Sequence, residues 1–203
     1  MILGTAGFTA ALALYRMKDN RQAPELGPLA VTGATGGVGS LAVDIFSRAG
    51  FDVHAISGKT GQADYLKAIG ATEVLGRDAL ATARPMESAR FGGGLDNVGG
   101  TMLASLLAQT APYGNVASAG LVATADLPIT VMPFIIRGVS LVGVASAGTA
   151  RDIREAVWQH LATDWKPRHL DRICTREIPM AQLPDVFATM LSGGSFGRTL
   201  VVM

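Results

Sequence analysis

The sequence predicts an α/β fold built on a doubly wound parallel sheet, with a short α+β tail at its carboxyl end. From residue 29 onward, short apolar runs alternate with helix-like stretches, which is the pattern of βα units. Many of the 25 glycines lie where these runs end, and such ends form the ligand crevice of an open parallel sheet. With 203 residues, 49% of them hydrophobic, the chain can bury a core as one large domain or as one domain with an appendage.

The expected elements follow one another in a regular order. Residues 2–15 predict a buried helix, followed by a loop that contains Pro24, Gly27 and Pro28. The strands expected in the sheet cover residues 29–32, 53–57, 73–75, 95–98, 115–119 and 139–145. The helices expected between and after them cover residues 38–49, 62–69, 102–111 and 150–162.

The carboxyl-terminal part does not continue this alternation. After Pro167 we expect an extended stretch over 173–178, a helix over 181–191 and a strand over 199–203. We therefore divide the chain into a leading helix and linker (1–28), a main domain (29–165) and a tail (166–203).

Charge and cysteine content narrow the expected partners to small molecules. The chain has 17 Lys plus Arg against 16 Asp plus Glu and no long basic run, so we expect no nucleic-acid partner and no membrane binding. The apolar run 2–15 resembles a signal-peptide core, but its first basic residue, Arg16, follows it, and about fourteen residues are too few to span a bilayer. A buried helix is the favoured interpretation. Cys174 is the only cysteine, so no internal disulfide can form, which favours a cytoplasmic location.

A glycine-rich turn between the first expected strand and its helix is the strongest functional signal. Gly33 suits the tight turn, Gly36 and Gly37 let backbone N–H groups approach a diphosphate, and Gly39 allows close packing of helix and strand. The spacing is G-x-x-G-x-x-G rather than the strict G-x-G-x-x-G. The turn predicts a Rossmann-type dinucleotide-binding domain; the alternative is a turn that serves packing alone.

The residues after the second strand favour NADP over NAD. An NAD site usually places a carboxylate there for the ribose 2′-hydroxyl, whereas this strand ends in Ser57 and Lys59, which suit a 2′-phosphate. Asp52 lies at the opposite end of the strand. A solvated loop lysine is the alternative for Lys59, and Arg77 is a further candidate to face the adenine side.

Several catalytic classes are disfavoured by the motifs. The three histidines form no metal-binding pattern, a single cysteine cannot complete a thiolate zinc site, and neither G-x-S-x-G nor Tyr-x-x-x-Lys occurs. We interpret Asp78 and Asp96 as structural caps rather than as an acid and a base. Residues 97–99, 119–121 and 145–146 follow later strands and are candidates to line the nicotinamide half of a cofactor site.

These features together resemble a known family, the zinc-free quinone oxidoreductase branch of the medium-chain dehydrogenase/reductases, and most closely its NADPH-dependent acryloyl-CoA reductases. The resemblance spans nearly the whole chain. It rests on GTAGFTA (4–10), VTGATGGVGSLAV (31–43), SGK (57–59), YLKAIGA (65–71), VMPFIIRGVSLVGV (131–144) and GRTLV (197–201).

The resemblance implies a set of cofactor-binding residues. The segment from Thr35 to Val38 would cradle the diphosphate, the loop from Ser57 to Lys59 would hold the 2′-phosphate, and the remaining candidates would lie near the nicotinamide. The full set is Thr9, Thr35, Gly36, Gly37, Val38, Ser57, Gly58, Lys59, Gly120, Leu121 and Ser146. Family members more often carry arginine where this chain has Lys59, which keeps the charge and loses the bidentate fork.

The implied activity is hydride transfer from NADPH to an activated alkene such as acryloyl-CoA, or to a quinone. Family members begin with a barrel-like domain that forms one wall of the catalytic cleft, and we expect this chain to start after it. We therefore assign no catalytic residue and no metal ligand. The alternatives are a non-catalytic module that senses NADPH and a chain that works only when a separate chain supplies the wall.

The resemblance also predicts two exposed edges. The stretches 173–178 and 199–203 would pack on the preceding domain, so we expect them to be poorly supported and to leave an apolar edge. The sixth strand, 139–145, is the expected edge of a homodimer related by a two-fold axis.

Overall fold

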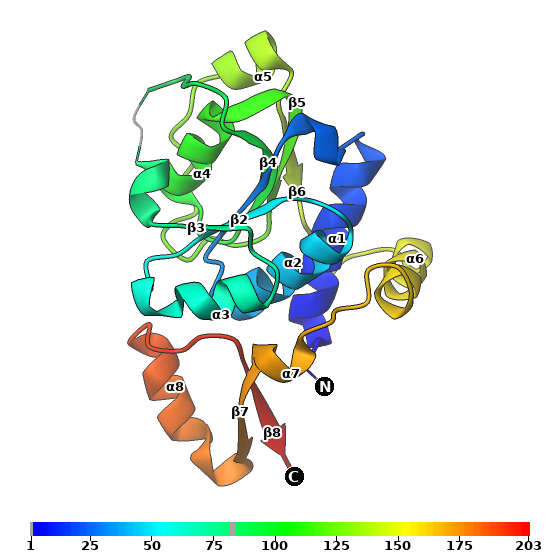
Figure 1. Cartoon of the computed structure of the whole chain (residues 1–203), viewed down its shortest axis with the longest axis vertical. Helices are drawn as coiled ribbons and strands as arrows, with labels where there is room; N and C mark the ends of the chain where they lie inside the picture. Colours follow the sequence, from blue (N-terminus) through cyan, green and yellow to red (C-terminus); the bar gives the residue numbers. More distant parts are fainter. Residues whose placement is uncertain (1, 82–83) are drawn as a thin grey trace.

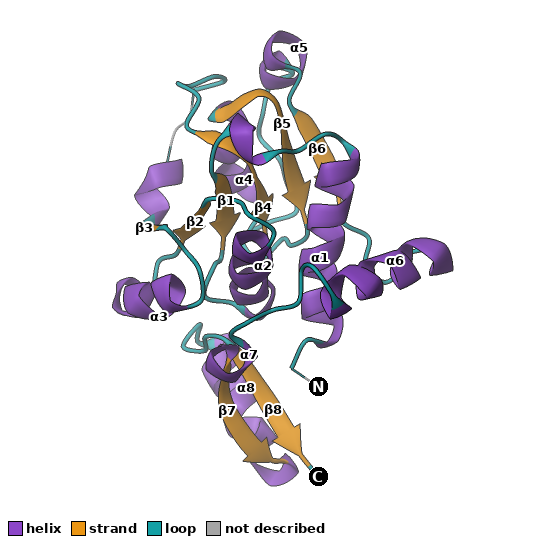
Figure 2. Ribbon diagram, turned by 45° about the vertical axis from the view of Figure 1, so that its right-hand side comes forward, coloured by secondary structure: helices purple, strands orange, loops and turns teal. Residues whose placement is uncertain are grey.

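Within residues 2–81 and 84–203, which the computed structural model describes, six parallel strands form one sheet in the order β3-β2-β1-β4-β5-β6. Helices cover both faces of the sheet, as Figures 1 and 2 show, so the predicted doubly wound α/β fold is confirmed. The strands are β1 (Leu29–Thr32), β2 (Val53–Ile56), β3 (Glu73–Leu75), β4 (Phe91–Asp96), β5 (Thr110–Ser118) and β6 (Ser140–Gly143).

Two apolar cores lie on opposite faces of the sheet. One core joins the sheet to the helices α1 (Gly4–Asp19), α2 (Gly37–Arg48), α3 (Ala63–Ala68) and α6 (Arg151–Ala162). The other joins it to α4 (Gly100–Ala108) and α5 (Met132–Arg137). Each β1 residue is buried, because a parallel strand between two helical layers has no face in contact with water.

Helix α1 is buried, as predicted. Its alanine-rich sequence favours a helix, and side chains such as Phe8, Leu12 and Leu14 pack in the same core as α2. Arg16 and Lys18 lie in its last turn, where a positive charge stabilises the negative end of the helix dipole. No helix within the described ranges is long and apolar enough to cross a membrane. The boundary that we placed at residue 28 stays a prediction, although α1 shares a core with the domain that follows.

Strand β4 begins at Phe91, whereas the sequence predicted a strand over 95–98. Its first half contains Gly92, Gly93 and Gly94, which lack the side chains that normally mark a strand. These glycines are needed because the neighbouring backbone is close: a Cβ atom on Gly94 would clash with the carbonyl oxygen of Ala30 in β1. Because these glycines have no side chains, β4 lies close to its neighbouring strands. For the same reason, this half of β4 carries no apolar pattern that would predict a strand.

Other boundaries also differ from the prediction. β5 begins at residue 110 rather than 115, and β6 is shorter than the predicted 139–145. The helix expected over 62–69 is a 3₁₀ turn (Thr60–Gln62) followed by α3. Within the described residues the structure adds two α-helices that the sequence did not predict, α5 and α7 (Leu170–Ile173). Both are short, and a run of four to six residues carries too few turns to show a helical period.

The tail forms a small separate sheet in which β7 (Cys174–Pro179) and β8 (Arg198–Val202) pair in parallel, joined through α8 (Leu183–Leu191). The two strands pair with each other, and their packing on a preceding domain stays a prediction. The expected apolar edge is present only in part: Val202 is 51% exposed, whereas Ile173 and Ile178 are buried. Apolar exposure in this unit is larger on α8, where Leu191 is 90% exposed. Figure 1 shows this unit below the main sheet, with β8 carrying the carboxyl terminus.

Candidate functional site

A cavity of about 700 Å³ runs along the carboxyl ends of β1, β2, β4 and β5. It lies where the strand order reverses, with β2 on one side of β1 and β4 on the other, which is the usual ligand crevice of such sheets. Eight of the predicted site residues line it: Thr35, Gly36, Gly37, Val38, Ser57, Gly58, Lys59 and Gly120.

The turn over residues 33–39, here called the phosphate loop, lies in the middle of the cavity, where β1 ends. Gly33 adopts φ +59°, and the Gly36 N–H donates to its carbonyl oxygen at 2.9 Å, which closes the tight turn. Helix α2 starts at Gly37, so its first N–H groups, which have no acceptor within the helix, lie at the cavity. A helix start of this kind binds anions through these N–H groups and the helix dipole.

Gly39 permits the close packing that places these N–H groups. A Cβ atom there would lie 2.7 Å from the Cα atom of Ala34 and would also clash with the Gly33 carbonyl oxygen. A Cβ atom on Gly36 would lie 3.2 Å from that same oxygen. The glycines therefore keep open a backbone cradle of the shape that a diphosphate requires.

The end of the cavity beyond β2 is positively charged. Ser57, Gly58, Lys59 and Arg77 line this end, here called the basic corner, and the described residues around the cavity include no carboxylate. The Lys59 N–H donates to Ser57 Oγ at 3.0 Å, and Ser57 Oγ lies 3.4 Å from Thr35 Oγ1. The Arg77 guanidinium lies against Gly58, where a Cβ atom would meet its Nε at 2.5 Å.

The surroundings of Lys59 disfavour its positive charge. Partial burial and, to a smaller extent, the positive charge of Arg77 lower the pKa of Lys59 below its usual 10.5. In the structure the Lys59 ammonium donates to the backbone carbonyl of Ser195. A doubly negative group placed between Lys59 and Arg77 would relieve their repulsion, so this corner is suited to a phosphate.

On the other side of the phosphate loop from the basic corner, the cavity wall is formed by Asn97, Val98 and Gly99 after β4, as the sequence suggested. Asp96 holds this turn: its carboxylate accepts from Gly99 N at 2.6 Å and from Thr32 Oγ1 at 2.7 Å. Burial raises the pKa of Asp96, and these hydrogen bonds oppose the rise. The structural role assigned to Asp96 is therefore confirmed.

Three predicted residues lie outside the cavity wall. Thr9 is buried in α1, where its Oγ1 donates to the Thr5 carbonyl at 2.8 Å. Leu121 is 66% exposed and lines a smaller neighbouring cavity of about 280 Å³. Ser146 follows β6, and its carbonyl accepts from Arg154 at 3.1 Å. Their place beside a nicotinamide stays a prediction.

Arg198 is a functional candidate that the sequence analysis did not assign. It begins β8, and its Nη1 would lie 3.0 Å from a Cβ atom on Gly37, at the start of α2. Its Nε donates to the Ile2 carbonyl at 3.1 Å. The GRTLV motif contained this residue, but nothing in the sequence indicated that β8 starts beside the phosphate loop.

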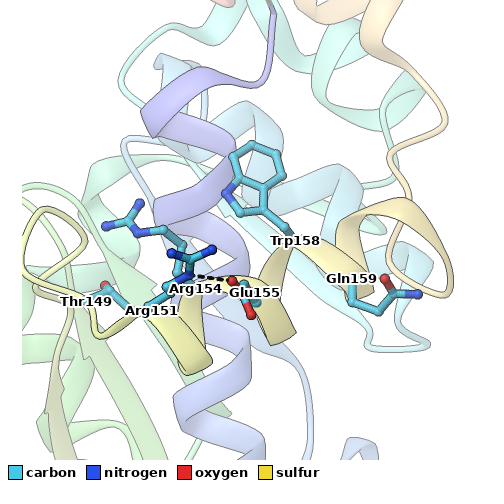
Figure 3. Close-up of a pocket in the computed structure, with 6 residues that line it drawn as sticks. All are labelled: Thr149, Arg151, Arg154, Glu155, Trp158 and Gln159. Atoms are coloured by element: carbon cyan, nitrogen blue, oxygen red, sulfur yellow. Dashed lines mark hydrogen bonds and ion pairs between the residues drawn. The ribbon is translucent and has the colours of Figure 1, made fainter.

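A second cavity, of about 740 Å³, lies beside α6 and is drawn in Figure 3. Its cations already have partners. Arg151 pairs with Glu155 at 2.7 Å, and the Arg154 guanidinium lies 4.6 Å from the Phe8 ring. Trp158 stacks on the same ring at 5.8 Å. Since this cavity has neither a phosphate loop nor a cation without a protein partner among its lining residues, we place the candidate site in the first cavity.

Comparison with known proteins agrees with this placement. The profile of the family described as "Zinc-binding dehydrogenase" matches residues 37–163, which include α2, the basic corner and the turn after β4. This stretch covers more than half of the chain.

Three relatives are similar over nearly the whole chain. "Putative quinone oxidoreductase YhfP" of Bacillus subtilis is 43% identical over 203 residues, and the crystal structure of B. subtilis yhfP with NAD bound has a TM-score of 0.96. "Acrylyl-CoA reductase AcuI" of Ruegeria pomeroyi is 41% identical over 203 residues. The structure of Escherichia coli K-12 YHDH with bound NADPH is 42% identical, with a TM-score of 0.94. Matches cover 99–100% of this chain, which spans 61–62% of the length of these relatives.

Proposed function

Because the chain belongs to the zinc-binding dehydrogenase family, we propose that it is the NADP-binding part of an oxidoreductase. The observation that carries the proposal is one cavity in which the phosphate loop lies beside a basic corner that contains Lys59 and Arg77. NADPH, when bound, supplies a hydride from its nicotinamide ring. Among the described residues there is no group of three His, Cys, Asp or Glu that could hold a metal ion, and we assign no metal ligand.

In this proposal the phosphate loop and the basic corner each bind one phosphate-bearing part of the cofactor. The N–H groups of Gly37 and Val38 donate to the diphosphate, with Arg198 beside them. Ser57, Lys59 and Arg77 bind the 2′-phosphate through a hydroxyl and two cations. The geometry supports NADP, while the relatives have been crystallised with NAD in one case and NADPH in another.

The nicotinamide half lies toward the turn over 97–99 and Gly120. We retain Thr9, Leu121 and Ser146 as proposed residues of that half, on the basis of the resemblance. The Asp96 carboxylate accepts hydrogen bonds from the N–H groups of Val98 and Gly99, so this turn is preorganised before a cofactor binds.

For the substrate we propose an activated alkene such as acryloyl-CoA, or a quinone, by analogy with the relatives' names. We assign no catalytic residue, and a cytoplasmic location also stays a prediction. The second candidate function is a non-catalytic NADPH-binding module, which the same cavity supports. Turnover separates the two.

We also propose a homodimer in which two copies of β6 pair at the open edge of the sheet. β6 is the last strand on that side, and Leu141 on it is 39% exposed; Ile135 of α5, the helix that precedes β6 in the chain, is 76% exposed. A monomer at high concentration in analytical ultracentrifugation would contradict this arrangement.

The test of the proposed function has two stages. The purified chain is first titrated with NADPH by calorimetry, beside a Gly148→Ala control at a glycine with open space around it. NADPH oxidation is then followed with acryloyl-CoA and with a quinone. Binding with turnover supports the oxidoreductase, binding without turnover supports the binding module, and absence of binding contradicts both.

A further inference from the structure

The segment from Gly193 to Gly197, here called the tail loop, lies against the phosphate loop and the basic corner of the cofactor cavity although it belongs to the carboxyl-terminal unit. Gly193 lines the cavity itself. The Gly197 N–H donates to the Thr35 carbonyl, in the phosphate loop, at 2.8 Å. The Ser195 carbonyl accepts from the Lys59 ammonium, in the basic corner. The tail loop therefore contacts both the phosphate loop and the basic corner.

Phe196 anchors the tail loop on the main domain. Its ring meets the Tyr65 ring of α3 edge to face, with 5.3 Å between centroids. Pairs of this geometry stabilise a contact beyond the area that they bury. Phe196 does not line the cavity, so its removal disturbs the position of the loop without removing a group from the cofactor site.

Lys59 connects the tail loop to the basic corner. Its ammonium has three N–H groups, and the Ser195 carbonyl takes one of them, which leaves two for a phosphate. A free lysine side chain loses rotamer entropy when it binds an anion, whereas one already held by a carbonyl has lost part of it beforehand. A docked tail loop thus prepares Lys59 for a phosphate.

We propose that the tail loop determines cofactor specificity: by holding Lys59 through the Ser195 carbonyl, it strengthens the binding of NADPH and leaves that of NADH unchanged. The inference rests on the proposed function, because it requires a nucleotide in the cavity. By linkage, NADPH stabilises the docked tail loop by the same factor by which the docked loop strengthens NADPH binding. NADH lacks the 2′-phosphate and takes no part in this coupling.

A double-mutant cycle tests the proposal, with Phe196→Ala, Lys59→Ala and the double variant titrated with NADPH and NADH. We expect Phe196→Ala to weaken NADPH binding about fivefold and NADH binding less than twofold. In the Lys59→Ala background we expect Phe196→Ala to have no further effect on NADPH, because the connecting side chain is gone. Phe187→Ala, at an exposed phenylalanine of the same unit, is the matched control and leaves both affinities unchanged.

Two results overturn the inference while the proposed function stands: equal weakening of both nucleotides by Phe196→Ala, or no weakening of either. If the wild-type chain binds neither nucleotide, the proposed function fails and the inference fails with it. Should Phe196→Ala not fold, hydrogen exchange on the wild-type chain decides. We expect amides of residues 193–197 to exchange at least about fivefold more slowly with saturating NADPH than with saturating NADH. Equal exchange overturns the inference.

Discussion

The phosphate loop and the basic corner of the cofactor cavity are built from different kinds of group. The phosphate loop uses backbone N–H groups, opened by Gly36, Gly37 and Gly39 and positioned by helix α2. The basic corner uses the side chains of Ser57, Lys59 and Arg77. A backbone site binds any diphosphate, since it reads no part of the molecule that differs between cofactors. A side-chain site can discriminate, because single charges are added or removed without changing the fold.

The largest expected effect comes from filling the phosphate loop. Gly39→Val places a branched side chain against the Gly33 carbonyl and the Ala34 backbone, so we expect at least about 3 kcal/mol loss of stability and loss of binding for both nucleotides. Thermal unfolding and calorimetry measure these effects, with Gly148→Ala as the control. A Gly39→Val chain of normal stability and affinity would show that the close approach is wrong.

A smaller effect is expected at the turn after β4, on the other side of the phosphate loop from the basic corner. Asp96→Ala leaves the part-buried Val98 N–H, the buried Gly99 N–H and the buried Thr32 hydroxyl without their acceptor, which costs about 2 kcal/mol. Chemical denaturation measures the loss of stability. NADPH and NADH affinities fall together, because the turn borders neither phosphate selectively; a selective loss of NADPH would contradict this assignment.

Arg198 tests the comparison further, because it is a charged side chain beside the phosphate loop, where the other proposed donors are backbone N–H groups. Arg198→Ala removes a positive charge beside Gly37, and we expect both nucleotides to bind about fivefold more weakly. Parallel titrations provide the measurement. If only NADPH weakened, Arg198 would belong with the basic corner instead.

The smallest expected effect is a pH dependence confined to the basic corner. Burial and Arg77 lower the pKa of Lys59, so its ammonium loses its proton at a lower pH than the usual 10.5. As pH rises through that lowered pKa, we expect the preference for NADPH to fall about threefold. Lys59→Arg keeps its charge and should keep the preference. In the chain without nucleotide, the unfolded state binds more protons in this window, so stability rises with pH.

Much of this architecture was predictable from local sequence. The strands β1 and β3, the buried helix α1 and the phosphate loop all depend on nearby residues, and eight predicted site residues line one cavity. The start of β4 was missed because its glycines carry no strand signal.

Arg198 and the tail loop were missed for a different reason. Their contacts with Gly37, Thr35 and Lys59 join residues far apart in the chain, and no local pattern encodes which loop meets which cavity. Sequence motifs identified the residues of GRTLV without indicating their neighbours.

The central claim is that the basic corner selects NADP, and parallel calorimetric titration of the wild-type chain and Lys59→Ala with NADPH and NADH tests it most directly. We expect NADPH to bind the wild-type chain more tightly, and Lys59→Ala to weaken NADPH about tenfold, or about 1.4 kcal/mol, with NADH unchanged. Equal affinities in the wild-type chain, or a preference that survives Lys59→Ala, would contradict the claim.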